Sequence, residues 1–376
     1  MNASASTNAA TAPAPPARLE SIDAYRGFVM LLMMAEVLQF EAVARAFPAS
    51  RLAAFLAHHQ SHVGWEGCSL HDLIQPSFSF LVGVALPFSL AARAARGQST
   101  GWMAAHAAWR AVVLVALGIF LRSVGWPRTN FTFEDTLTQI GLGYPVLFLL
   151  GLRPPREAWA AFVAILVGVW LAWTAWGGDD PWAKNANLGH AFDLWFLNLF
   201  PRSAPFTGND GGYLTLSFIP TLATSILGLI AGRWLQDRAP LRRFVIAGLV
   251  CLAAGWLLSA TGLCPIVKRI WTPAWVLFSG GWCLLLLAAF HAVVDLRGWR
   301  AWARPLEVIG MNSIAAYLIM HLWHGFIEKA LVRHLGAGVF TVAGPGLKPL
   351  LLGAATLAVM WAILWWMQRR RILLRV

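Results

Sequence analysis

The segment from residue 58 to residue 79 concentrates the side chains of this sequence that could carry out acid–base or nucleophilic chemistry. It holds four of the ten histidines, among them His62 and His71, and it places an acid, Asp72, at the start of an apolar run. An imidazole beside a carboxylate can accept a proton or attack a carbonyl carbon near neutral pH. Ionisable groups next to a hydrocarbon segment are costly, so we expect these to have a partner and a function, with Asp72 the partner of one imidazole.

Two other apolar runs carry polar side chains. Glu36 lies near the middle of the first run, where a carboxylate costs about 2.5–3.5 kcal/mol unless it is partnered, hydrated or protonated. The structural alternative to a role in a site is a protonated Glu36 bonded to a neighbouring helix. Near the C-terminus, side chains at helical spacing form a polar stripe on a helix predicted to be unkinked, from which Asn312 points away. The stripe consists of Ser313, Tyr317, His321 and His324. Hydrogen-bonded core histidines are the alternative for this stripe.

The composition predicts an integral membrane protein. Of 376 residues, 58% are hydrophobic and only 12% are charged, and the mean hydropathy is +0.61. Such a chain needs a lipid bilayer around it. We predict an all-α, polytopic transmembrane bundle of about ten helices, with spans near residues 27–45, 73–92, 110–125, 138–152, 158–176, 214–235, 244–261, 274–294, 306–326 and 350–368.

The net charge of +12 follows from topology rather than from nucleic-acid binding. With a cytoplasmic N-terminus, most of the 29 basic residues fall on the cytoplasmic side, where they agree with the positive-inside rule and can contact anionic lipid. Both termini are therefore expected in the cytoplasm, with no nucleic acid as partner. The loop carrying His62 is expected on the opposite side.

The N-terminal stretch differs from the rest of the chain. Residues 1–17 are rich in Ala, Ser and Pro and contain neither a charge nor an apolar core, which predicts a disordered tail instead of a signal peptide. Residues 18–376 then form one transmembrane domain. A basic-inside chain of this kind is expected in a bacterial inner membrane.

Several familiar motifs are absent from the sequence. It contains no GxxxxGK[ST] loop, GxGxxG fingerprint, GxSxG elbow or HExxH helix, which argues against nucleotide-hydrolysing pumps, dinucleotide enzymes and zincins. The four cysteines are scattered without metal-ligand spacing, so we predict neither a metal site nor a disulfide framework.

Four blocks, in this order and spacing, resemble the family of the lysosomal heparan-α-glucosaminide N-acetyltransferase and its bacterial relatives. They read RLESIDAYRGF, HVGWEGCSLHDLIQPSFSFLVGVALPFSL, PIVKRIWTPAWVLFSGGWCLLLLAAFHAVVD and GMNSIAAYLIMHL. The similarity runs with gaps from Arg18 to about residue 368. It implies a polytopic acyltransferase that takes acetyl groups from cytosolic acetyl-CoA and delivers them to a sugar or glycan across the membrane. A homodimer is one candidate assembly.

The resemblance also implies roles for individual residues. The family's active histidine falls on His62 and its following acid on Asp72, while its GMNS block and the next histidine fall on Asn312 and His321. The family's first-span asparagine falls on Val37 in an ungapped count, so Glu36 beside it becomes the candidate for that polar role.

Two schemes of acyl transfer remain open for His62. It can act as the base that accepts a proton from the acceptor, or it can attack the thioester and carry the acetyl group. In either scheme Asp72 or Glu36 would orient the ring, and Asn312 or a backbone N–H would meet the developing oxyanion. For the phosphates of acetyl-CoA we expect cytoplasmic-side arginines as partners, namely Arg93, Arg96, Arg242 and Arg243.

Two functions from other classes compete with an acyltransferase. The first is a secondary transporter or flippase for a polar or lipid-linked substrate, in which Glu36, Asp72 and His321 form a proton relay. An inverted repeat would favour it, and the sequence shows none. The second is a degenerate relative that acts as a membrane scaffold, against which the retained His62 and Asp72 argue.

Overall fold

The protein is described here by a computed structural model covering residues 19–374, and the predicted tail of residues 1–17 lies outside that range. Within it, the regular structure is helical apart from one isolated backbone bridge. The α-helices are α1 (Glu20–Met34), α2 (Phe40–Ala46), α3 (Arg51–Gln60), α4 (Ile74–Ala94), α5 (Thr100–Ser123), α6 (Thr136–Gly151), α7 (Pro155–Trp176), α8 (Leu188–Phe196), α9 (Phe218–Gln236), α10 (Leu241–Ala260), α11 (Pro273–Phe290), α12 (Arg304–Met311), α13 (Ser313–Leu335) and α14 (Lys348–Arg369).

The helices form a polytopic bundle, as the composition predicted. Among the described residues, seven helices are long and apolar enough to cross a membrane, and two bent helix pairs raise that number to as many as nine. The remaining predicted span corresponds to α6, an apolar helix of only 16 residues. The all-α membrane fold is thus confirmed, and the count of ten is approximate.

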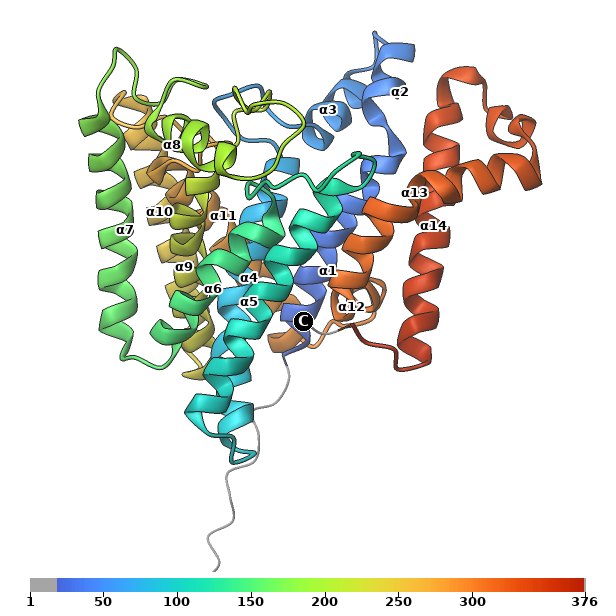
Figure 1. Ribbon diagram of the computed structural model, residues 1–376. Coiled ribbons are helices and arrows are strands. Elements are labelled where there is room, and N and C mark those ends of the chain that lie inside the picture. The colour runs from blue at the N-terminus through green and yellow to red at the C-terminus, as the bar shows by residue number, and fades with distance from the viewer. Residues whose placement is uncertain (1–18, 375–376) are drawn as a thin grey trace, which may run out of the picture.

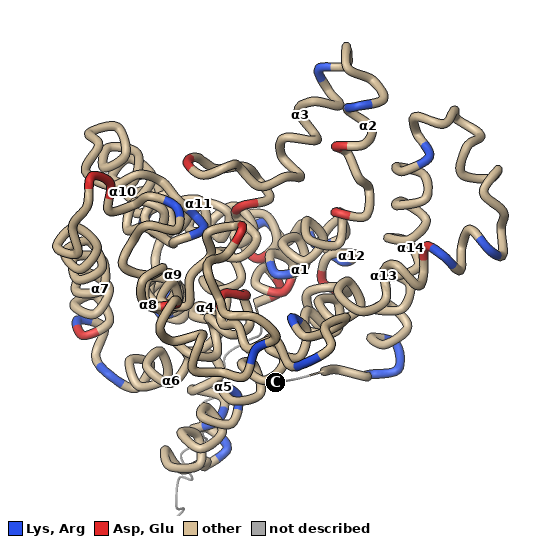
Figure 2. The backbone as a smooth tube through the Cα atoms, turned by 45° about the horizontal axis from the view of Figure 1, so that its top comes forward, with Lys and Arg blue, Asp and Glu red and all other residues tan. Residues whose placement is uncertain are grey.

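Long helices run between two ends of the bundle, which we call the upper and lower ends as they appear in Figure 1. The upper end carries the short helices α2, α3 and α8, and the lower end carries the connection between α4 and α5 and both ends of the described chain. Figure 2 shows Lys and Arg residues gathered near the start of α5 at the lower end. The two ends therefore differ in both structure and charge.

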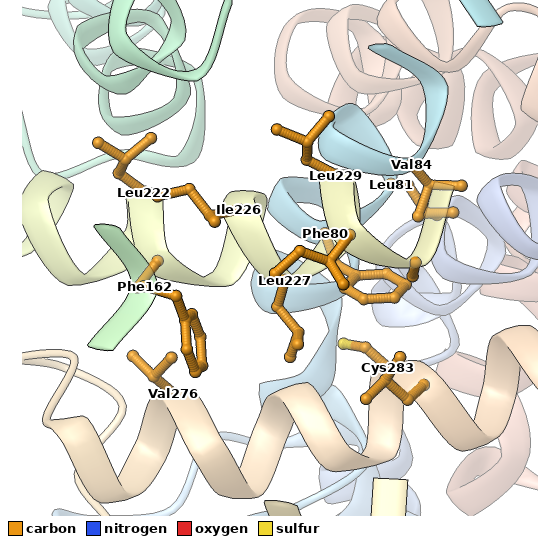
Figure 3. Close-up of a cluster of buried hydrophobic side chains, with 14 of the residues drawn as sticks. Phe80, Leu81, Val84, Phe162, Leu222, Ile226, Leu227, Leu229, Val276 and Cys283 are labelled. Atoms are coloured by element: carbon orange, nitrogen blue, oxygen red, sulfur yellow. The ribbon is translucent and has the colours of Figure 1, made fainter. Parts of the chain in front are cut away.

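The centre of the bundle is the contact between α4 and α9. Small residues allow it, because a Cβ atom on Gly83 of α4 would overlap the backbone of α9, and one on Gly228 of α9 would overlap the backbone at Phe80. Phe80, together with Leu227 of the same contact and Cys283 of α11, belongs to the buried cluster drawn in Figure 3. α4 therefore runs through the core of the bundle, with its N-terminal end at the upper end and its C-terminal end at the lower end.

Two spans are broken, and both breaks place polar side chains. The helix predicted to be unkinked around Asn312 bends by 78° between α12 and α13, which corrects that prediction. Asn312 is fully buried at the break, where its side chain donates to the carbonyl oxygen of Ile372 (3.0 Å) and accepts from the N–H of Leu374 (3.2 Å). In the first span, α1 passes into a short 3-10 turn, Ala35–Leu38, and then bends by 41° into α2.

Candidate active site

The loop that follows α3 carries His62 and is fixed to the loop that precedes α11. Glu66 and Val267 form an isolated antiparallel bridge, and the N–H of Gly67 donates to the carbonyl oxygen of Ile266 at 3.0 Å. Arg269 adds a hydrogen bond to the carbonyl oxygen of Val63 at 3.3 Å. These contacts bring together two segments about 200 residues apart in sequence and set Lys268 against the histidine loop.

Asp72, His62 and Lys268 form a compact charged cluster at the upper end of α4. Asp72 Oδ1 lies 2.8 Å from His62 Nδ1 and 3.2 Å from Lys268 Nζ, and Lys268 Nζ lies 3.1 Å from His62 Nδ1. The second oxygen of Asp72 accepts from the backbone N–H groups of Val63 (3.3 Å) and Ser69 (3.0 Å). The side chain of Asp72 is only 1% exposed, so it is enclosed by these partners, whereas His62 is partly exposed.

The contacts of Asp72 determine which nitrogen of His62 is available for chemistry. An ionised carboxylate can only accept, so its contact with Nδ1 is a hydrogen bond when the ring carries its proton there, and Lys268 Nζ, which can only donate, then contacts that nitrogen without a hydrogen bond to it. The lone pair is then on Nε2, and the 39% exposure of the side chain leaves the ring accessible from a pocket. This is the arrangement expected of a base or nucleophile oriented by a carboxylate.

The surroundings of His62 favour its neutral form. Burial lowers the pKa of His62, and the ammonium group of Lys268 and the ring of His71 lower it further, whereas the hydrogen bond to Asp72 opposes the shift. Burial also lowers the pKa of Lys268, against the attraction of Asp72, which favours its charged form. A neutral imidazole is the form that can accept a proton or attack an acyl group.

His62 opens onto an upper pocket of about 310 Å³, a volume in the range of small-ligand sites. Its polar lining comes from both broken spans and from several loops. The predicted site residues Glu36 and His321 both line it, and Tyr317 and His324 of the polar stripe lie beside them. Further polar lining residues are His71, Gln75, Arg122, Glu134, Asp135, Thr136, Tyr213 and Lys268.

A second, lower pocket of about 710 Å³ lies along the same helices and is strongly basic. Four arginines line it, namely Arg26, Arg93, Arg96 and Arg110, together with one acid, Asp23, which lies 3.2 Å from Arg26. Aromatic side chains accompany them: the guanidinium of Arg93 lies 5.3 Å from the ring of Trp102, and that of Arg110 lies 4.6 Å from the ring of Tyr144. Cations beside aromatic faces suit a ligand that combines phosphate groups with a planar base.

The two pockets share walls. Phe78 lines both of them, and the residues of α4 on either side of it follow one helical face, with Gln75 in the upper pocket and Val82, Ser89 and Arg93 in the lower one. From Gln75 to Arg93 this face spans roughly 27 Å at the α-helical rise per residue. The polar stripe of α13 also lines both pockets, because Ser313 lines the lower pocket and Tyr317 lines the upper one.

The other predicted site residues lie elsewhere. Asn312, the predicted oxyanion partner, lines neither pocket and uses its amide to hold the C-terminal segment, two residues of which line the lower pocket. Arg242 and Arg243, at the start of α10, are also absent from both pockets, and the guanidinium of Arg243 lies 4.5 Å from the ring of Trp234. Of the four predicted arginines, Arg93 and Arg96 line the lower pocket.

Three residues of the two pockets, Lys268, Arg26 and Arg110, were not among the site residues predicted from the sequence. Lys268 is 95% buried, although it stands in a short loop between two proline-bounded apolar segments where a lysine would normally be exposed. A lone lysine in the largely apolar block PIVKRIWTP was the available signal. In the sequence, Arg110 is one of the basic residues of the cytoplasmic side, and Arg26 forms a pair with Asp23 one helical turn away, which the structure shows at 3.2 Å.

Comparisons with known proteins agree with the resemblance seen in the sequence. No protein-family model matches the chain. The human heparan-alpha-glucosaminide N-acetyltransferase is 25% identical over 366 residues, which cover 81% of this chain and 52% of the human protein. The mouse protein of the same name is 23% identical over 369 residues, covering 80% and 53%. The chain spans about half the length of these curated relatives, and the two matches support its membership in the heparan-alpha-glucosaminide N-acetyltransferase family.

Proposed function

We propose that this integral membrane protein is an acetyltransferase that moves an acetyl group from acetyl-CoA, bound in the lower pocket, to a sugar or glycan acceptor in the upper pocket. In this proposal the lower end faces the cytoplasm. The relatives are named as N-acetyltransferases, which supports the reaction class. The observation that carries the proposal is the single face of α4 that connects the arginine-lined pocket with the pocket of His62.

The lower pocket has the chemistry that a coenzyme A thioester requires. Its phosphate groups would pair with Arg93, Arg96, Arg26 and Arg110, and its adenine would stack near Trp102. The thioester arm would then lie along α4 past Phe78, the residue common to both pockets. The acetyl group would arrive beside His62 while the charged part of the donor stays at the lower end.

At the acetyl group, His62 Nε2 supplies the reactive lone pair. It either attacks the thioester carbonyl and carries the acetyl group, or takes the proton of the attacking acceptor. Asp72 holds the ring in the tautomer that this requires. Tyr213 lines the same pocket, and burial raises its pKa, so its protonated hydroxyl is available as a donor to the developing oxyanion.

The transporter alternative receives less support from the geometry. A proton relay across a membrane needs ionisable groups distributed along the bilayer normal. Glu36 and His321 line the same upper pocket, and Asp72 lies directly behind it. The three groups are therefore gathered at one end of the bundle.

The proposal is tested with purified protein in detergent, labelled acetyl-CoA and a panel of amino sugars and glycans. We expect label to move to an acceptor, and we expect His62→Ala to abolish transfer without weakening acetyl-CoA binding. His58→Ala is the matched control, because His58 is exposed on α3 and does not line the upper pocket. A wild-type protein that neither binds acetyl-CoA nor transfers label to any acceptor would contradict the proposal.

A further inference from the structure

The upper pocket contains a second histidine–carboxylate pair. His71 Nε2 lies 3.1 Å from Glu36 Oε1, and the ring centroid of His71 lies 4.6 Å from that of His62. Both residues of this pair line the pocket. The role proposed above for His62 uses neither of them.

The local structure directs the two pairs to different places. His71 and Asp72 are neighbours in the 3-10 turn His71–Leu73 that begins the α4 span, so their side chains leave the backbone in different directions. Asp72 contacts His62 and Lys268, whereas His71 contacts Glu36 from the first span. One short turn therefore contributes a residue to each of the two histidine–carboxylate pairs.

Glu36 is positioned by the break in the first span. Gln39 adopts a left-handed conformation (φ 51°) directly after the turn that carries Glu36. The side chain of Gln60 bridges the break, donating to the carbonyl oxygen of Ala35 and accepting from the N–H of Phe40 at 2.9 Å. Since Gln60 already satisfies backbone groups that the break exposes, the Glu36–His71 contact is not needed for that purpose.

The carboxylates of Asp72 and Glu36 differ in their exposure to the upper pocket. The side chain of Asp72 is 1% exposed and is enclosed by donors, whereas that of Glu36 is 44% exposed and reaches the pocket. A carboxylate in the position of Asp72 orients a ring, and one in the position of Glu36 can meet a substrate. An amine or hydroxyl that attacks an acyl carbon must give up a proton, and an accessible carboxylate held by an imidazole can receive it.

We propose that Glu36, oriented by His71, is the base that accepts the proton of the sugar acceptor, separate from the donor-side group His62. This deepens the proposed function and rests on it. As the acceptor N or O atom bonds to the acetyl carbon, its proton passes to the Glu36 carboxylate. Since Glu36 takes that proton, His62 acts as the carrier of the acetyl group: CoA has already left as thiolate, the bond from the acetyl carbon to His62 Nε2 breaks, and its electron pair returns to that nitrogen.

The division of labour predicts which kinetic constants change. Glu36→Gln preserves the shape of the side chain but removes the proton acceptor, so kcat for transfer to an acceptor such as glucosamine should fall by about 100-fold or more. Binding of labelled acetyl-CoA should change less than about twofold. Glu41→Gln is the matched control, because Glu41 lies on α2 in an exposed pair with Arg45 and does not line the upper pocket.

The role of His71 is tested by two substitutions. His71→Gln keeps an N–H donor for the carboxylate and should retain more transfer activity than His71→Leu, which removes it. A merely structural role would lower the thermal stability of both variants without separating their kcat values. The inference is overturned if Glu36→Gln keeps transfer within threefold of wild type, or if it loses acetyl-CoA binding together with transfer. If the wild type transfers nothing, the proposed function itself fails.

Discussion

Removing the cation of Lys268 tests the central cluster most directly. The Lys268 side chain is 5% exposed, and Lys268→Met replaces it with a side chain of similar length. The substitution removes the ammonium group, which lies 3.2 Å from Asp72. Removing one partner of a buried ion pair costs about 3–5 kcal/mol, because the other charge is left buried. Asp72 keeps His62 and two backbone N–H donors, so we expect the lower limit, about 3 kcal/mol of unfolding free energy.

The same substitution should change the pH dependence of transfer. The ammonium of Lys268 contributes to the lowered pKa of His62, so its removal raises that pKa. Only neutral His62 is reactive, and its fraction falls once the pH drops below the pKa. A higher pKa therefore moves the acidic limb of the pH–rate profile to higher pH.

Two measurements check these expectations. Thermal unfolding in detergent gives the loss of stability, and kcat/KM from about pH 5 to pH 8.5 gives the acidic limb. Lys184→Met is the control. Lys184 is an exposed lysine in the loop between α7 and α8, and its substitution removes the same formal charge. Adding Asp72→Asn to Lys268→Met should recover part of the lost stability. An acidic limb that stays in place, in a folded variant, would refute the electrostatic role assigned to Lys268.

Three other substitutions examine the packing, the donor pocket and a buried acid. Gly83→Leu should prevent the close contact of α4 with α9 and leave little folded protein in size-exclusion chromatography, whereas Gly168→Ala on α7, with open space around it, should be tolerated. Arg93→Gln should raise KM for acetyl-CoA by about tenfold, the effect of one lost charged hydrogen bond, while Arg242→Gln should leave it unchanged. Burial raises the pKa of Asp193 to about 6, so the folded state binds an extra proton and stability falls as the pH rises from about 4 to 6. Asp193→Asn should flatten that fall and add about 3 kcal/mol near pH 7, measured as unfolding temperature against pH.

Patterns that depend on local spacing were predictable from the sequence. The apolar runs gave the long helices, because burial in lipid requires each span to satisfy its own backbone hydrogen bonds. The helical spacing of Tyr317, His321 and His324 correctly indicated one polar face, since that periodicity is fixed by the helix itself. The pairing of His62 with Asp72 could also be predicted, because only ten residues separate them in the sequence.

What the sequence did not indicate depends on contacts between distant segments. The break at Asn312 is stabilised by the backbone of residues 372 and 374, and no local signal marks it. Arg242 and Arg93 are equally basic in sequence, yet only Arg93 lies on the helix face that leads to the upper pocket. Positive charge near a membrane surface follows topology, so it does not distinguish a phosphate-binding arginine from one that only orients the chain.

The contact of Lys268 with the His62–Asp72 pair could be recognised only in the three-dimensional structure. A charged lysine close to a histidine lowers the pKa of the histidine, because two like charges repel. Here Asp72 contacts both groups, and its carboxylate favours the charged form of Lys268 while burial and the ammonium of Lys268 lower the pKa of His62. The cluster can then maintain a reactive imidazole over a pH range in which an isolated Asp–His pair would be partly protonated, since the carboxylate alone raises the pKa of its histidine.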